Sequence, residues 1–111
     1  MSAITTHILD TAEGRPAPGV PVRLEGRKGD DWHLLAEVAT DADGRARDLG
    51  PERVEAGTYR LIFGTATYFA AMDRRAFYPE VDVVFEIHDS EQHYHVPLLL
   101  SPYGYSTYRG S

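Results

Sequence analysis

The chain has 111 residues, of which 42% are hydrophobic and 25% charged, and this is ordinary usage for a single globular domain over residues 1–111. Its 17 acidic and 11 basic residues give a net charge of -6, which argues against nucleic acid or an anionic membrane as a partner. Because the chain has no cysteine, it can form no disulfide, and packing must hold the fold.

The start of the chain predicts neither export nor a membrane anchor. Residues 1–7 contain no basic segment followed by an apolar one, so they do not resemble a signal peptide. The longest apolar runs, such as residues 96–100, fall far short of the roughly 20 residues that a membrane-spanning helix needs. We therefore expect a cytoplasmic protein whose partners are small molecules or other protein chains.

The first quarter of the chain predicts two strands with a loop between them. Residues 4–9 form the first candidate strand, which contains His7, and residues 10–19 predict a loop because they are rich in glycine and proline. Over residues 20–24 every second residue is valine or leucine, which is the period of a strand with one buried face. Pro21 has no N–H to donate, so it indicates an edge strand or the start of a strand.

The middle of the chain predicts two more strands and a turn that presents an arginine. The polar stretch 26–31 predicts a turn that leads into a strand over residues 32–40. The turn at residues 41–44, rich in aspartate and ending in glycine, then presents Arg45 at the start of the next short segment. Residues 58–63 alternate apolar and exposed positions, which predicts a strand.

The second half of the chain predicts one helix followed by three strands. Residues 65–74 carry several alanines and few β-branched side chains, which favours a short helix. Strands are predicted over residues 81–87, 94–100 and 103–109, with turn-forming residues between them. Seven or eight short strands and one helix indicate an all-β fold, a two-sheet β-sandwich.

Two histidines, His93 and His95, stand two positions apart, so on a strand their side chains point the same way. The pair suggests a metal site, but zinc usually needs a third or fourth ligand. No evident cluster supplies these further ligands, and His7 and His88 are only weak candidates for them. His93 lies next to a turn, which favours an exposed strand end without chemistry. His95 precedes an apolar run, where a neutral imidazole can serve as a general base.

The last nine residues are rich in tyrosine, and alternate side chains of residues 105–110 would face opposite ways on a regular strand. Polar groups would then lie on both faces. Terminal residues are usually frayed, so a decorative edge strand is one interpretation. An ordered terminus with a function is the sharper hypothesis.

The sequence of residues 95–111 is His-Val-Pro-Leu-Leu-Leu-Ser-Pro-Tyr-Gly-Tyr-Ser-Thr-Tyr-Arg-Gly-Ser. This segment closely resembles the C-terminal signature of the transthyretin-related 5-hydroxyisourate hydrolases, whose chains end in Tyr-Arg-Gly-Ser. The similarity extends over essentially the whole chain, through residues 7–10, 14–17, 20–24, 40–45 and 78–79. The resemblance implies a transthyretin-like sandwich of two antiparallel sheets with one short helix. It also implies a homotetramer, a dimer of dimers with active sites along a central channel.

The resemblance further implies which residues act. The catalytic residues would be His7, Arg45 and His95. The substrate would be bound by the end of the chain and the strand before it, through Ser106, Tyr108, Arg109, Gly110 and Ser111, and the alternative role for Arg109 is to orient the end of the chain. No metal ion and no cofactor is expected.

Successive side chains of the strand over residues 94–100 would then point alternately into two buried regions, the core of the sandwich and the channel of the tetramer. The core would receive one set of side chains, from Tyr94, Val96, Leu98 and Leu100. The channel would receive the other set, from His95, Pro97 and Leu99, with Ser106 and Tyr108 on the neighbouring strand.

The reaction implied by the resemblance is the hydrolysis of 5-hydroxyisourate in urate breakdown, in which water opens a cyclic amide to give 2-oxo-4-hydroxy-4-carboxy-5-ureidoimidazoline. A neutral histidine can take the proton of the water, and His95 and His7 are both candidates for this base. Arg45 is suited to hold an anionic urate derivative and to stabilise the charge that develops at the attacked carbonyl.

Two other classes of function are alternatives. A non-catalytic transthyretin-like carrier of small aromatic ligands would have the same fold without needing His7, Arg45 and His95 together. A generic β-sandwich interaction module would be indifferent to its last residues. Deletion of residues 109–111 separates these classes, because only the hydrolase interpretation predicts lost turnover with the tetramer largely kept.

Overall fold

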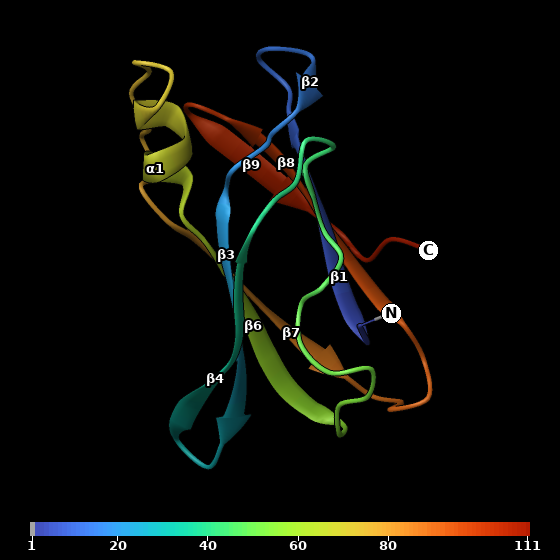
Figure 1. Ribbon diagram of the computed structural model, residues 1–111. Helices are drawn as coiled ribbons and strands as arrows, with labels where there is room; N and C mark the ends of the chain where they lie inside the picture. The colour runs from blue at the N-terminus through green and yellow to red at the C-terminus, as the bar shows by residue number, and fades with distance from the viewer. Residues whose placement is uncertain (1) are drawn as a thin grey trace.

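The computed structural model describes residues 2–111, which form two β-sheets with one helix at an end of the molecule (Figure 1). The first sheet contains, in this order, β2 (Arg15–Pro16), β1 (Ile4–Asp10), β8 (Tyr94–Ser101) and β9 (Gly104–Thr107), with β5 (Arg45–Ala46) also paired to β1. The second sheet contains, in this order, β4 (Asp31–Ala39), β3 (Pro21–Lys28), β6 (Gly57–Phe63) and β7 (Val81–Ile87). The helix α1 spans Thr65–Ala70.

The predicted fold, an all-β sandwich of two largely antiparallel sheets with one short helix, is confirmed. Within residues 2–111 no helix has the length and apolar character needed to cross a membrane. Pro21 is the first residue of β3, as its missing N–H indicated, although β3 lies inside its sheet between β4 and β6.

One strand pair departs from the antiparallel pattern. β1 and β8 run parallel, with Thr5 opposite His95 and His7 opposite Pro97. Because side chains alternate between the two faces of a strand, neighbours in this register lie on the same face of the sheet. The parallel pair therefore brings β1 side chains next to His95, although they are about ninety positions away along the chain.

The core lies between the two sheets, and β8 contributes one of its faces. The four side chains of β8 that were predicted to pack the core are buried in one hydrophobic cluster, namely Tyr94, Val96, Leu98 and Leu100. On the other face of β8, His95 and Leu99 are half-buried and Pro97 is buried. The two-residue alternation of this strand thus separates the core from the face that carries His95.

The turn predicted over residues 26–31 is shorter in the structure, because β3 continues to Lys28 and the hairpin turns at Gly29 and Asp30. Gly29 has a φ of 62°, a conformation that favours glycine. Figure 1 shows this hairpin extending beyond the body of the sandwich. Its polar residues pair across the ladder, and the guanidinium of Arg60 stacks 4.3 Å from the ring centroid of Trp32. Pairing and cation–π contact, more than core burial, hold this hairpin.

Two other predicted elements are shorter in the structure. The helix ends at Ala70 instead of residue 74, and Asp73 adopts a φ of 53°, which no α-helix continues. The last strand ends at Thr107 instead of residue 109. Beyond it the chain returns to β8, where Gly110 forms an isolated bridge with His95.

Candidate active site

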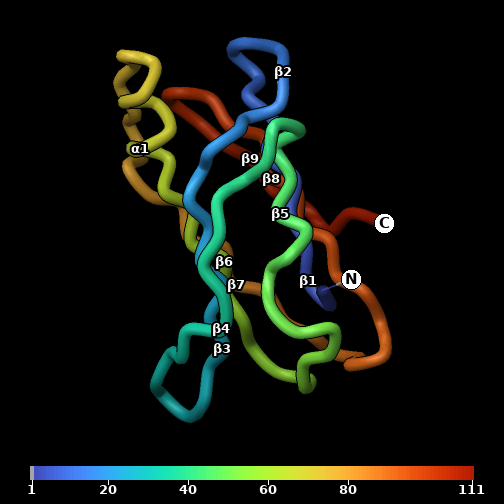
Figure 2. The backbone as a smooth tube through the Cα atoms, in the orientation of Figure 1, coloured from blue at the N-terminus to red at the C-terminus, as the bar shows by residue number. Residues whose placement is uncertain are grey.

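A hollow of about 420 Å³ opens on the outward face of the first sheet, around the start of β8. It is lined by residues from β1, from β5 and the segment after it, from the start of β8 and the position before it, and from the end of the chain, namely Thr5, Thr6, Arg45, Arg47, His93, His95 and Ser111. Figure 2 shows the chain after β9 leaving the sheet beside β1 and β8. The structure thus brings together three residues predicted to act: Arg45, His95 and Ser111.

A tight turn presents Arg45 to this hollow. The carboxylate of Asp41 accepts hydrogen bonds from the main-chain N–H of Asp43 at 2.9 Å and of Arg45 at 3.0 Å. These bonds hold the pKa of Asp41 below its ordinary value, and the charges of Arg47 and Arg45 contribute. Gly44 has a φ of 74°, and a Cβ there would lie 2.4 Å from the Ile8 carbonyl oxygen. Only glycine therefore lets the turn approach β1 closely enough to pair with it.

The Arg45 guanidinium is a cation without a partner among residues 2–111, since it forms no hydrogen bond or ion pair with any of them, and its residue is half-buried. Arg47, which lines the same hollow, lies 3.7 Å from a carboxylate oxygen of Asp41. A guanidinium offers several donors in one plane and remains charged at any physiological pH. Arg45 is therefore free to bind an anionic or carbonyl group that enters the hollow.

The imidazole of His95 lies beside this cation. Its Nδ1 is 2.8 Å from the Thr5 hydroxyl oxygen, and its Nε2 forms no hydrogen bond to any residue from 2 to 111. Burial lowers the pKa of His95, and the positive charge of Arg45 and the nearby His7 and His93 lower it further, partly offset by a hydrogen bond to the Thr5 main chain. The ring is therefore neutral near pH 7, as a general base must be.

His7 is placed differently from His95. It sits opposite Arg45 in the β1–β5 pair, and its Nε2 is 2.9 Å from the main-chain oxygen of Asp43. Because a carbonyl oxygen can only accept, this nitrogen must carry the hydrogen. The ring thus ties β1 to the turn that presents Arg45, and its Nε2 is not available to take a proton.

The end of the chain packs directly against His95. The N–H of Gly110 donates to the His95 carbonyl oxygen at 2.8 Å. A Cβ at position 110 would lie 2.7 Å from Cδ2 of His95 and 3.3 Å from Cγ of Pro97. Arg109 turns away from the hollow, stacks 4.3 Å from the ring centroid of Tyr94 and donates to the Gln92 side chain at 3.2 Å. Arg109 therefore anchors the end of the chain, while Gly110 allows its close approach.

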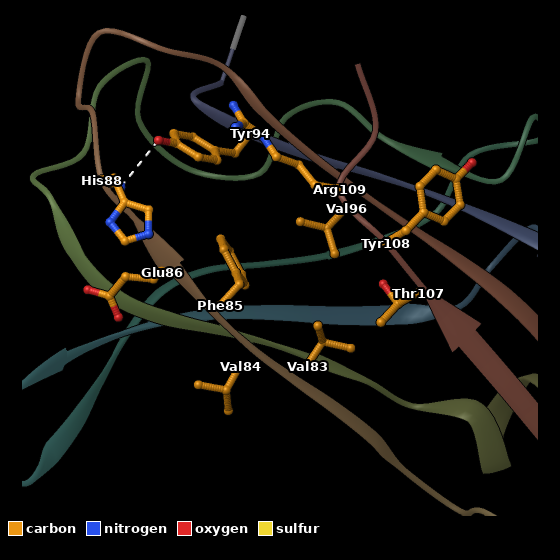
Figure 3. Close-up of a pocket in the computed structure, with 10 residues that line it drawn as sticks. All are labelled: Val83, Val84, Phe85, Glu86, His88, Tyr94, Val96, Thr107, Tyr108 and Arg109. Carbon is orange, nitrogen blue, oxygen red and sulfur yellow. Dashed lines mark hydrogen bonds between the residues drawn. The ribbon is translucent and has the colours of Figure 1, made fainter.

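Ser106 and Tyr108 do not line the hollow around His95 in the single chain. Ser106 is exposed and pairs with Leu99 in the β8–β9 ladder. Tyr108 and Arg109 instead border a second hollow of about 410 Å³ (Figure 3). Figure 3 shows β7 side chains such as Val83 on one side of it and Val96 of β8 on another.

Three residues that line the site were not predicted from the sequence, namely Thr5, Thr6 and Arg47, and a fourth, His93, was interpreted as an exposed strand end without chemistry. Arg47 could have been found, because it stands two positions after Arg45, but no local signal marks Thr5 or Thr6. Their place in the site follows from the parallel pairing of β1 with β8. Within residues 2–111 no group of three His, Cys, Asp or Glu side chains is arranged to hold a metal ion.

Bacterial 5-hydroxyisourate hydrolases are similar to this chain over nearly its whole length. The chain is 52% identical over 109 residues to a 5-hydroxyisourate hydrolase of Salmonella typhi, a match that covers 97% of this chain and 80% of the relative. The enzyme of the same name from Caulobacter vibrioides is also 52% identical, over the full length of both chains.

Two solved structures share the fold. A 5-hydroxyisourate hydrolase from Klebsiella pneumoniae superposes with a TM-score of 0.86 at 38% identity, covering 97% of this chain and 98% of its own. Sea bream transthyretin in complex with thyroxine superposes with a TM-score of 0.92 at 33% identity, covering 97% and 94%. The sequence profile of the HIUase/Transthyretin family matches residues 4–110. The chain therefore belongs to the HIUase/Transthyretin family.

Proposed function

We propose that this chain is a hydrolase that opens the cyclic amide of 5-hydroxyisourate. The observation that carries the proposal is that the cation Arg45 and the neutral histidine His95 line one hollow, and that neither the Arg45 guanidinium nor Nε2 of His95 has a partner in residues 2–111. A carrier needs a cavity but no base. Relatives that are 52% identical over nearly the whole chain bear the name of this hydrolase, which supports the same choice.

In the proposed reaction, Nε2 of His95 takes a proton from a water molecule as the water oxygen attacks the ring carbonyl carbon. Arg45 donates hydrogen bonds to the oxyanion that forms and to the anionic substrate. Collapse of the tetrahedral intermediate breaks the ring C–N bond, and the leaving nitrogen receives the proton back from His95. The product is a carboxylate, 2-oxo-4-hydroxy-4-carboxy-5-ureidoimidazoline, and the proton of the new carboxyl group goes to solvent.

His95 is favoured over His7 as the base. His95 lines the hollow with an Nε2 that has no partner among the described residues, whereas His7 is not part of the lining and its Nε2 donates to Asp43. His7 then serves to hold the Arg45 turn against β1. Ser111 lines the hollow and can hydrogen-bond the substrate, and Gly110 and Arg109 hold Ser111 there.

We also propose a homotetramer, built as a dimer of dimers. β7 and β9 are the end strands of their sheets, and both border the hollow of Figure 3. A second copy that paired with these edges would cover apolar side chains such as Val83 and Val84 and would remove two open sheet edges. Ser106 and Tyr108, which lie away from His95 in one chain, would then reach a site shared between chains. Light scattering measures the mass and tests this arrangement.

The direct test generates 5-hydroxyisourate in place with uricase and follows the loss of its ultraviolet absorbance. The chain should accelerate the decay, and His95→Ala should lose most of this acceleration, by about two to four powers of ten. The matched control is His33→Ala, on the exposed strand β4. If folded protein does not accelerate the decay, the hydrolase proposal fails, and binding of thyroxine-like aromatic ligands becomes the function to measure.

A further inference from the structure

Two side chains of the site have no part in the reaction as proposed above, yet they are joined to the base. The hydroxyl oxygen of Thr5 lies 2.9 Å from Nε2 of His93 and 2.8 Å from Nδ1 of His95. Thr5 is 7% exposed, and it stands opposite His95 in the parallel β1–β8 pair. One buried hydroxyl therefore bridges two imidazole rings.

The hydroxyl couples the protons of the two rings, because it has one hydrogen to donate. If Thr5 donates to His93, then Nδ1 of His95 must donate to Thr5, and Nε2 of a neutral His95 keeps its lone pair. If Thr5 donates to His95 instead, the proton of a neutral His95 must sit on Nε2, which cannot then accept another. Accepting from both rings would leave the buried hydroxyl hydrogen without an acceptor among residues 2–111.

The surroundings of His95 favour the first arrangement. The Thr5 main chain favours the protonated form of the His95 ring and raises its pKa, as a nearby carbonyl acceptor does. Nδ1 is the ring nitrogen on the Thr5 side. The lone pair is then on Nε2, the nitrogen that has no partner in residues 2–111.

We propose that Thr5 and His93 are positioning residues that keep the proton of His95 on Nδ1, and that a proton taken up by His93 switches this base off. The inference rests on the proposed function. A protonated His93 has an N–H at both ring nitrogens, so its Nε2 must donate to the Thr5 oxygen. The Thr5 hydrogen then turns to Nδ1 of His95, and the His95 proton moves to Nε2.

The charged groups around the two rings favour this division of roles. Those that face His95 come from β1, from β5 and from the segment after β5, and they are His7, Arg45 and Arg47. Those near His93 have both signs, and they are Glu52, Arg53, Glu91 and Arg109. Positive charge is therefore disfavoured at His95, and His93 is the exposed ring of the pair.

The first test removes the hydroxyl and restores it. Thr5→Val keeps the shape of the side chain without its oxygen, and Thr5→Ser keeps the oxygen. We expect Thr5→Val to lower kcat about tenfold or more with little change in KM, since a base with its proton on the wrong nitrogen cannot act. Thr5→Ser should retain kcat within about threefold. Equal kcat in wild type and in folded Thr5→Val would overturn the inference.

The second test changes His93, whose exposed position makes misfolding of the variants less of a concern. The amide oxygen of His93→Gln can accept from Thr5 but cannot take a proton, so kcat should persist and the acid limb of the pH profile should move to lower pH. His93→Leu offers no acceptor, and its kcat should fall as in Thr5→Val. An unmoved acid limb in His93→Gln, or full kcat in His93→Leu, would contradict the switch.

A third measurement needs no substrate, so it separates failure of the inference from failure of the proposed function. The ¹⁵N chemical shifts of His95 report which ring nitrogen carries the proton. We expect the proton on Nδ1 in the wild type near pH 7 and a shift of population to Nε2 in Thr5→Val. A wild type with the proton on Nε2 would sink the inference even if the chain hydrolyses 5-hydroxyisourate.

Discussion

Strand β1 contributes to two polar clusters, which differ in how completely the chain supplies hydrogen-bond partners to their charged groups. At its last residue, the fully buried carboxylate of Asp10 accepts from the Tyr68 hydroxyl at 2.7 Å, from Arg74 at 2.8 Å and from the main-chain N–H groups of Ala12 and Glu13. Nearer its start, Thr5 borders the hollow in which Arg45, paired opposite His7 in the β1–β5 ladder, has no partner among the described residues. One cluster is saturated and the other is incomplete.

The saturated cluster ties separate parts of the fold together. Burial by itself would raise the pKa of Asp10, but the bonds from Arg74, the Glu13 N–H and Tyr68 outweigh it and hold this pKa below its ordinary value. Burial and the same carboxylate raise the pKa of Tyr68 to about 12. Arg74 lies just after α1 and Asp10 ends β1, so the cluster fastens the helix region to the first sheet.

The contrast teaches how to separate structural from functional charge in this small sandwich. A buried charge whose hydrogen-bonding capacity is filled by the chain stabilises the fold, and removing one partner is costly. A half-buried cation beside a neutral base, each with hydrogen-bonding groups that have no partner among the described residues, can bind a ligand. Single substitutions should therefore lower stability in the Asp10 cluster and lower activity in the hollow that contains Arg45.

The largest effect is expected from Arg45→Gln. This change should lower kcat/KM for 5-hydroxyisourate by about a hundredfold to a thousandfold, because it removes the cation that meets the developing oxyanion. The free energy of unfolding should stay within about 0.5 kcal/mol of the wild type, since the guanidinium holds no other described residue. Arg47→Gln is the control and should cost less than about tenfold, because Arg47 already faces Asp41. Equal losses in both variants would refute a special role for Arg45.

The next largest effect is expected on stability, from Asp10→Asn. An amide cannot compensate Arg74, and its NH₂ group would face donors, so urea unfolding should show a loss of about 3 kcal/mol. Activity per folded molecule should remain. The control is Asp30→Asn on the exposed hairpin, which should change the unfolding free energy by less than about 0.5 kcal/mol.

The same variant carries a pH signature. Because the folded-state pKa of Asp10 is depressed, its stabilisation is complete above the ordinary value of 3.8 and is lost as the pH falls through the folded pKa. The stability difference between wild type and Asp10→Asn should therefore be constant near neutral pH and shrink below pH 3.8. A difference that does not change with pH would show that packing, not charge, is what the variant removed.

The smallest effect is expected from Gly110→Ala. The added Cβ would lie 2.7 Å from Cδ2 of His95, so the ring or the chain end must shift, and kcat/KM should fall about tenfold to a hundredfold. Gly104→Ala is matched to it, because its Cβ would meet nothing closer than the Ser101 hydroxyl at 3.8 Å. Gly104→Ala should therefore retain activity. Wild-type turnover in Gly110→Ala would mean that the chain end does not position His95.

Much of this arrangement was accessible from the amino-acid sequence. The alternation of apolar residues predicted β6, β7 and β8 close to their observed bounds and the core-facing residues of β8. The turn that ends in Gly44 predicted where Arg45 would emerge, because aspartate and glycine have strong local preferences. The resemblance to the hydrolase family singled out Arg45, His95 and Ser111, which line one hollow.

The elements predicted incorrectly are those whose limits depend on distant partners. Residues 26–28 look like a turn in isolation, yet they continue β3 because β4 pairs with them. The helix composition continues to residue 74, but Arg74 is drawn to Asp10, which lies in another element. Local propensity is a weak preference, and a tertiary contact of a few kcal/mol overrides it.

The sequence by itself determined the alternating strands, the turn chemistry and the residue types of the site, because these depend on neighbours within a few positions of the chain. The tertiary structure alone decided that β1 runs parallel to β8 in the register that sets Thr5 against His93 and His95. That register joins segments about ninety positions apart, and it is selected by packing both faces of the sheet at once. The tertiary structure therefore determines which ring nitrogen of His95 is free, and with it the proposed base.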